Sequence, residues 1–287
     1  MSKPVFITSD STCDLTPELL ERFNVKTAPL HVLLGEDTYL DGVNFTQEMI
    51  FERYAKDKTL PRTAAVSPQE FTDFFTPLVE AGYEVIFLSI SSGLSGTYQN
   101  AVIAAQDLPS IYPIDTRKLT TGVGEMVLAA CKMRDEGMDA ASIAKAMEEM
   151  IPRVNVSFVI DTLEYMWKGG RCSGVTALGA NMLKLKPSLE IRDGKLVVCK
   201  KYRGAMEKVY RQYVTERLAG KSVVEDWAFI THSGEVSEET LQELTALVRE
   251  LAPFKEVFIT QAGCTVSSHC GPGTLGVLFL RQPEPAQ

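Results

Sequence analysis

Four groups of residues in this 287-residue chain combine small hydroxyl side chains, glycines and single cations in patterns that could bind an anion. The first, Thr8-Ser9-Asp10-Ser11-Thr12, follows the first predicted strand, residues 5–8. Ligands of open α/β sheets bind in the crevice at the carboxyl ends of the strands, which makes Ser11 a candidate ligand-binding residue. The competing interpretation is that these hydroxyls only satisfy backbone groups of a turn or a helix cap.

The second group is Arg62-Thr63-Ala64-Ala65-Val66-Ser67, which precedes a predicted helix starting at Pro68. Ser67 and Glu70 form a capping-box pattern, so helix capping alone explains the Ser67 hydroxyl. No capping role accounts for Thr63, whose hydroxyl is therefore free to donate a hydrogen bond to a ligand.

The third group, Ser91-Ser92-Gly93-Leu94-Ser95-Gly96-Thr97, joins a predicted strand to a predicted helix. Glycines allow the backbone to approach an anion closely, and a helix start supplies free N–H groups and a favourable dipole. Ser95 and Gly96 are therefore candidate ligands of a carboxylate or a phosphate. A capped helix start without any ligand explains the pattern equally well.

The fourth group places one cation or imidazole beside glycine in three segments, which are Lys168-Gly169-Gly170-Arg171, Arg203-Gly204 and Ser267-Ser268-His269-Cys270-Gly271-Pro272-Gly273. Taken alone, Arg171 is explained as a cation that favours a helix C-terminus, and His269 as a packed turn residue.

The composition excludes several classes of function. A net charge of −8 argues against a nucleic-acid binder, and three histidines without helical pairing argue against a zinc site. Six cysteines without a C-x-x-C pair, and a first strand candidate close to Met1, favour a reduced cytoplasmic protein without an export signal. No apolar run approaches the roughly 18 residues of a membrane span.

One segment departs from the acidic balance. Residues 184–203 contain seven basic side chains and only two acidic ones. The segment is either a solvated strand pair or a surface that meets an acidic partner or, transiently, an anionic membrane.

The elements that must position these residues suggest two α/β domains, 1–155 and 156–287. In the first, short β-branched runs alternate with amphipathic helices, which predicts a sheet with helices on both faces. In the second, a hairpin with an Asp193-Gly194 turn is followed by alternating helices and strands, which predicts a two-layer α+β domain. The predicted strands are residues 5–8, 25–34, 84–90, 111–114, 156–160, 189–191, 196–199, 227–231, 256–260 and 275–280. The predicted helices are residues 17–23, 47–56, 68–81, 98–107, 125–136, 140–150, 163–168, 177–183, 206–218 and 238–251.

Taken together, the motifs resemble the DegV family of fatty-acid-binding proteins. The resemblance extends over nearly the whole chain, in order and in spacing. The matching segments are Ser9-Asp10-Ser11-Thr12, residues 63–68, residues 91–98, Asp115-Thr116 with Gly122 and Gly124, residues 163–171, Lys184, Lys186 and Pro187 with Asp193-Gly194-Lys195, and residues 269–273.

This resemblance implies a lipid carrier that is not itself an enzyme and uses no cofactor or metal. It implies one long-chain fatty acid, such as palmitate, stearate or oleate, in a buried tunnel, with its carboxylate held by Thr63 and Ser95. It further implies presentation of the lipid to an ATP-dependent fatty acid kinase for phospholipid synthesis, a step served by Arg171, Arg203 and His269. The family's usual T-S-Q-P-S is Thr63-Ala64-Ala65-Val66-Ser67 here, so one hydroxyl of the pattern is missing.

Two other functions compete with the carrier. A serine hydrolase of acyl esters would use Ser95 with His269 and Asp10 or Asp115, although Ser95 lacks the spacing of a nucleophile elbow. A nucleotide site at the loop from Gly93 to Gly96 would lack the lysine of a Walker motif.

Overall fold

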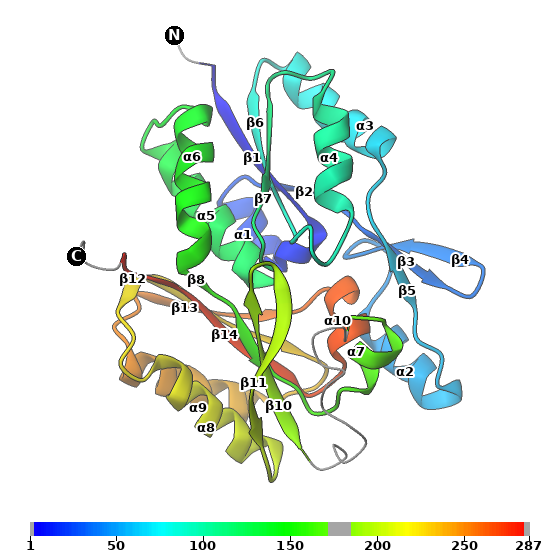
Figure 1. The fold of residues 1–287 in the computed structure, drawn as a ribbon, viewed down its shortest axis with the longest axis vertical. Helices are drawn as coiled ribbons and strands as arrows, with labels where there is room; N and C mark the ends of the chain where they lie inside the picture. Colours follow the sequence, from blue (N-terminus) through cyan, green and yellow to red (C-terminus); the bar gives the residue numbers. More distant parts are fainter. Residues whose placement is uncertain (1–2, 172–184, 284–287) are drawn as a thin grey trace.

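The computed structural model describes residues 3–171 and 185–283 of the chain. The predicted helix over 177–183, together with Cys172 and Lys184, lies outside the described residues. Figure 1 shows two layered units, one above the other, with the long helix α5 between them.

The first unit is built on a four-stranded parallel sheet with helices on both faces, as predicted. Its strand order is β2-β1-β6-β7, with bounds β1 (Val5–Asp10), β2 (Lys26–Ala28), β6 (Glu84–Ser89) and β7 (Ile111–Asp115). Side chains alternate along β6, so that Val85 and Phe87 join one core while Ile86 and Leu88 join another. One face is covered by α3 (Pro68–Glu80) and α4 (Thr97–Ala105), and the other by α1 (Pro17–Arg22), α5 (Thr121–Asp135) and α6 (Ala140–Met150).

A small antiparallel sheet projects from this unit beside helix α2 (Gln47–Asp57). Its strands are β3 (His31–Leu34), β4 (Asp37–Leu40) and β5 (Arg62–Ala64), in the order β4-β3-β5. The prediction of one strand over 25–34 is wrong, because β2 and β3 belong to different sheets. Pro29 stands between them and has no N–H to donate to a continuing ladder.

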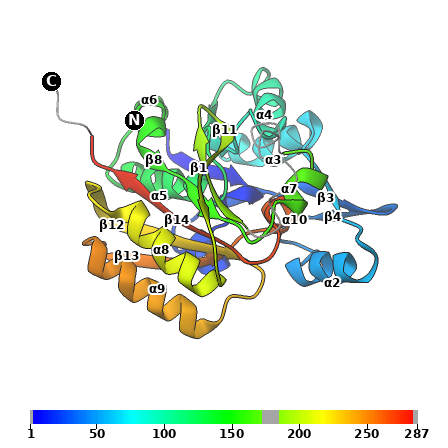
Figure 2. The same ribbon diagram turned by 60° about the horizontal axis from the view of Figure 1, so that its bottom comes forward.

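The second unit contains a seven-stranded mixed sheet. The order is β11-β10-β9-β14-β12-β13, with β8 paired to β14. Bounds are β8 (Val154–Asn155), β9 (Ser157–Val159), β10 (Lys186–Arg192), β11 (Lys195–Tyr202), β12 (Val223–Ser233), β13 (Glu256–Gln261) and β14 (Thr274–Arg281). Helices α8 (Met206–Leu218) and α9 (Glu238–Leu251) cover one face, seen most clearly in Figure 2. The fold is thus the predicted two-domain α/β arrangement, and a boundary near residue 155 stays a proposal. Strand β8 already pairs with β14, so the second sheet begins at Val154, just before the proposed boundary.

Helix α5 fills the space between the two sheets, and its residues from Thr121 to Cys131 are all buried. It begins four residues before the predicted start, although Gly122 and Gly124 lower helix propensity there. Both glycines are needed for packing. A Cβ at Gly124 would lie 2.8 Å from the Cys13 carbonyl oxygen, and one at Gly122 would lie 2.2 Å from Val156 Cγ2.

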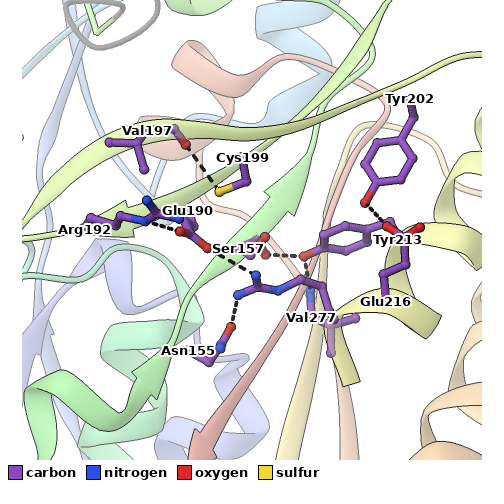
Figure 3. Close-up of polar contacts among 11 residues, drawn as sticks. Asn155, Ser157, Glu190, Arg192, Val197, Cys199, Tyr202, Tyr213, Glu216 and Val277 are labelled. Atoms are coloured by element: carbon purple, nitrogen blue, oxygen red, sulfur yellow. Dashed lines mark hydrogen bonds and ion pairs between the residues drawn. The ribbon is translucent and has the colours of Figure 1, made fainter. Parts of the chain in front are cut away.

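The β10–β11 hairpin has the predicted Asp-Gly turn, in which Asp193 and Gly194 both have positive φ. Arg217 on α8 bonds Glu190 of β10, close to the turn, and Asn155 of β8, and Glu190 also binds Arg192 (Figure 3). In the same close-up, the Tyr213 hydroxyl donates to the Ser157 carbonyl at 2.6 Å. The hairpin is therefore held to the rest of its sheet by polar contacts as well as by strand pairing.

Two short helices follow the strands of the second unit, α7 (Glu164–Lys168) and α10 (Cys264–Cys270). The interpretation of His269 as a turn residue is wrong, because it lies in the last turn of α10. Among the described residues, the helices are all too short or too polar to cross a membrane.

Candidate functional site

A cavity of about 410 Å³ lies between the two units of the fold. On one side are the loops that follow the parallel strands of the first unit, and on the other is the mixed sheet of the second unit. The β6–α4 loop contributes Ser95 and Gly96, and β5 contributes Thr63. Its apolar lining includes Leu30, Ile90, Leu94, Leu119, Phe158, Met166, Leu196, Val266 and Leu278. A volume of this size with a mainly apolar wall and a few convergent polar groups is typical of a small-molecule site.

The polar end of the cavity contains a contact between distant parts of the chain. Thr63 Oγ1 lies 2.9 Å from His269 Nε2, and both residues line the cavity. The hydrogen-bond direction depends on the imidazole tautomer. If Nε2 carries the proton, it donates to Thr63, whose own hydroxyl proton is then free to point at a ligand.

The imidazole is held in a buried position that only a glycine permits. A Cβ at Gly169 would lie 2.3 Å from His269 Nδ1. Burial lowers the pKa of His269 to about 4, and the positive charge of Arg171 adds to the shift. His269 is therefore neutral near pH 7. Arg171 also lines the cavity, and its Nη1 donates to the Gly169 carbonyl at 2.8 Å.

The start of α4 is a second source of donors. Gly96 is its N-cap and provides no side-chain cap, while the Ser95 hydroxyl contacts the Thr97 hydroxyl at 2.8 Å. The loop is fixed from both sides, since Ser92 bonds Asp115 and the Ser91 hydroxyl donates to the Gly194 carbonyl at 2.8 Å. Ser95 and Gly96 therefore line the cavity from a loop that is bonded to two neighbouring segments, although the Thr97 amide already donates to the Ser95 hydroxyl at 3.3 Å.

Helix α10, which carries His269, is capped by acidic residues from the first half of the chain. The amide of Gly263 donates to Asp14 at 2.8 Å, and that of Cys264 donates to Asp41 at 2.7 Å. Burial raises the pKa of Asp14 well above its ordinary value, and the neighbouring Asp41 adds to the shift. Ser11 belongs to this network, because its hydroxyl donates to Asp41 and accepts from the Leu30 amide. Ser11 is not among the cavity-lining residues, so its position favours support of α10 over contact with a ligand.

Arg203 lies apart from the cavity, exposed after the end of β11. In the basic segment, three of the other cations are neutralised, Lys186 by Asp161, Arg192 by Glu190 and Lys200 by Glu216. Lys195 and Lys201 are exposed and stand outside these ion pairs. The structure thus brings Thr63, Ser95, Gly96, Arg171 and His269 to one cavity and leaves Arg203 on the surface.

The contacts at the site do not form a hydrolase triad. His269 Nε2 contacts Thr63 rather than Ser95, and within the described chain His269 Nδ1 is buried without a hydrogen-bond partner. Asp10 accepts bonds from Thr12, Ser89 and Ile90 instead. A triad needs the base on the nucleophile and a carboxylate on the base.

The loop proposed for a nucleotide is closed by the hairpin. A Cβ at Gly93 would lie 2.6 Å from the Gly194 carbonyl oxygen, so the tip of the β10–β11 turn occupies the space beside this glycine.

The sequence analysis missed several polar residues of the cavity, including Thr120, Thr231 and Thr274, and two of the missed residues have unbonded hydroxyls in the described part of the chain. The hydroxyls of Thr265 and Ser157 are buried and unbonded within the described residues, and both side chains line the cavity. Thr265 and His269 are four residues apart, a spacing that puts them on one helix face. If Gly263 had been recognised as the N-cap of a helix, this four-residue spacing would have placed Thr265 beside His269.

Comparisons with known proteins match nearly the whole chain. A family model described as "Uncharacterised protein, DegV family" matches residues 4–282. A DegV domain-containing protein of Caldanaerobacter subterraneus subsp. tengcongensis is 32% identical over 277 residues, which cover 96% of this chain and 98% of the relative. One from Deinococcus radiodurans is 32% identical over 280 residues, covering 95% and 97%.

Two solved structures share the fold. The first, described as fatty acid binding of a DegV family protein from Thermus thermophilus, has a TM-score of 0.87 and 31% identity and covers 98% of this chain and 100% of that chain. The second, described as DegV, a fatty acid binding protein from Bacillus subtilis, has a TM-score of 0.84 and 26% identity, with the same two coverages. Motifs, fold and relatives agree over nearly the full length, and the chain belongs to the DegV family.

Proposed function

We propose that this protein binds one long-chain fatty acid in the cavity between its two sheets and presents it to a separate ATP-dependent fatty acid kinase. The observation that carries the proposal is the contact between Thr63 and His269 at the polar end of an otherwise apolar cavity. The related proteins of Thermus thermophilus and Bacillus subtilis, described as binding fatty acids, support the same ligand class.

The polar end suits a carboxylate. A neutral His269 with its proton on Nε2 donates to Thr63, and Thr63 in turn donates to the carboxylate, with Ser95 and the Gly96 end of α4 as further donors. A buried carboxylate without such partners would be costly. Arg171 lines the same cavity and supplies a positive charge nearby.

The apolar wall suits the acyl chain. Burial of each methylene contributes about 0.8 kcal/mol, so ten or more of them offset the desolvation of one carboxylate. Leu94, Phe158 and Leu278 come from both units of the fold, so chain binding would also hold the two units together.

The presentation step is the finer part of the proposal. Arg203 and Lys201 are exposed cations near the end of β11, where they suit an acidic kinase surface or an arriving phosphate. Arg171 and His269 stand at the carboxylate itself, where the phosphoryl group must be transferred.

The binding part is tested by native mass spectrometry of protein purified from a bacterial host, followed by analysis of an organic extract. We expect a mass increase of one fatty acid per chain. Finding only the bare polypeptide, before and after incubation with oleate, would count against the proposal.

The presentation part is tested with a bacterial fatty acid kinase, ATP and acyl-phosphate detection. We expect Arg203→Ala to keep its bound lipid while acyl-phosphate formation falls at least tenfold. Arg249→Ala, an exposed arginine on α9, is the matched control. Equal activity of both variants would remove Arg203 from the partner surface.

A further inference from the structure

The acyl cavity follows β14, the strand that leads away from its polar end. Thr274, Gly276 and Leu278 line the cavity at every second position of β14, because alternate residues of a strand share a face. The Thr274 hydroxyl donates to the carbonyl of Cys270 at 3.0 Å, and Cys270 follows His269 at the end of α10. The row of lining residues therefore starts near the polar end of the cavity, and Leu278 lies at its far end.

A second row of residues, on the neighbouring strand β12, stops at the same level. Thr231 lines the cavity opposite Gly276, and the next residue on that face, Phe229, is fully buried and lies opposite Leu278. The ring of Phe258 on β13 packs against Phe229 with 5.4 Å between the centroids. Phe229 and Leu278 thus stand side by side across the sheet at the far end of the lining rows, and together they form an end pair.

A cavity of about 250 Å³ with charged walls lies beyond the end pair. Trp227 and Leu280, the next residues on the same faces of β12 and β14, line this second cavity, together with Glu125, Lys132 and Asp226. The end pair thus separates a mainly apolar space from a charged one. Burial of charged groups against an acyl chain is unfavourable, so the second cavity offers no stabilising continuation for the chain.

The volume of the acyl cavity indicates how much of a chain fits before the end pair is reached. An engineered cavity of about 150 Å³ holds benzene, which amounts to about 25 Å³ for each carbon atom. On that scale the cavity of about 410 Å³ holds about sixteen carbons. A methylene that is buried in the cavity raises the affinity about fourfold, whereas one that has no room does not.

We propose that Phe229 and Leu278 select the chain length of the ligand, because they end the acyl cavity after about sixteen carbons. This inference rests on the fatty-acid binding proposed above and adds the substrate class, which is a fatty acid of the length of palmitate. The methyl end of the chain packs against the Leu278 side chain, and the Phe229 ring closes the space beside it.

The affinities of laurate, myristate, palmitate, stearate and arachidate for the full-length protein test this proposal, in a displacement assay with a fluorescent fatty acid. In the wild type we expect the affinity to rise about fifteenfold with each added pair of methylenes up to palmitate. From palmitate to arachidate we expect no further rise.

The end pair itself is tested by a matched pair of variants. Phe229→Val replaces the ring by an isopropyl group and lengthens the cavity, so stearate should bind at least about tenfold more tightly than palmitate. Phe279→Val is the control, because Phe279 is just as buried but points to the opposite face of β14, into the core under α8 and α9. The control should keep the wild-type limit at palmitate.

A second pair of variants decides the question if Phe229→Val does not fold. Leu278→Ala shortens the other member of the end pair and should also move the limit from palmitate to stearate. Val277→Ala, next to it on β14 and facing the core under α8 and α9, should not.

The outcomes that contradict this inference differ from those that contradict the proposed function. If the wild type binds none of the five acids, the carrier function is refuted and the inference falls with it. If wild-type affinity keeps rising from palmitate to arachidate, the cavity does not end at the end pair. A limit that stays at palmitate in Phe229→Val and Leu278→Ala, or that moves equally in the two control variants, places the end of the cavity elsewhere.

Discussion

Thr63 and His269 are 206 residues apart in the chain, yet their side chains meet at 2.9 Å at the polar end of the acyl cavity. One comes from the edge of the small antiparallel sheet and the other from the last turn of α10. The contact makes the proposed carboxylate site depend on how the two halves of the fold sit together.

Removing the Thr63 hydroxyl should weaken lipid binding. In Thr63→Val the shape is kept but the relay from His269 to the carboxylate is broken. A hydrogen bond to a charged group contributes about 1.5–3 kcal/mol, so we expect affinity for oleate to fall about tenfold to hundredfold. Thr63→Ser keeps the hydroxyl and is the matched control. A displacement assay with a fluorescent fatty acid measures both, and wild-type affinity in Thr63→Val would refute the relay.

The stability of the protein should depend on pH through His269. The pKa of about 4 in the folded state lies below the ordinary 6.5, so the unfolded chain binds more protons between these values. The contribution of His269 is therefore complete above pH 6.5 and is lost as the pH falls toward 4. Between pH 6.5 and pH 5 the loss is about 1.6 kcal/mol.

Urea unfolding of the wild type and of His269→Gln at these two pH values measures this loss. Buried carboxyl groups such as Asp14 and Glu125 titrate in both proteins, so their effect cancels in the difference. Identical pH dependence of the two proteins would show that His269 is not kept neutral by burial.

A methyl group at position 169 should displace the imidazole. The Cβ of Gly169→Ala would lie 2.3 Å from His269 Nδ1, and overpacking of this kind costs about 1–3 kcal/mol. We expect both stability and oleate affinity to fall. In the double variant with His269→Ala the clash with the imidazole is gone and only the 3.0 Å approach to the Tyr165 carbonyl oxygen is left, so stability should recover relative to the sum of the single changes. If the losses in unfolding free energy of the two single variants simply add in the double variant, residues 169 and 269 are not in steric contact.

Loss of the Asp41 carboxylate should loosen α10. In Asp41→Ala the buried amide of Cys264 loses its acceptor, which costs about 1–3 kcal/mol. Asp41→Asn keeps one oxygen acceptor and should cost less. Hydrogen exchange of the Cys264 amide reports the change directly. Unchanged protection in Asp41→Ala would show that α10 is held by its packing alone.

Local patterns in the sequence were sufficient for most elements. The Asp-Gly turn, the capping box at Ser67 and the apolar periodicity of α8 and α9 predict their elements nearly to the residue, because turn chemistry and amphipathic spacing act within a few neighbours. The predictions failed where tertiary packing outweighs the local helix propensity of the residues, at the start of α5 and at α10. The glycines at the start of α5 are tolerated because two sheets press on that helix, and α10 exists because Asp14 and Asp41, far away in the chain, cap its first amides.

The same division holds for the site. The sequence alone determined the family, the two-domain architecture and a set of hydroxyl and basic residues beside glycines, because residue types and spacings are properties of the chain itself. Only the tertiary structure decided that Thr63 meets His269, that Ser11 supports α10, that Arg203 stands on the surface and that Glu125 faces a second cavity. These relations join segments a hundred residues or more apart or depend on which face of a helix is buried, and both are fixed by long-range packing rather than by any local pattern.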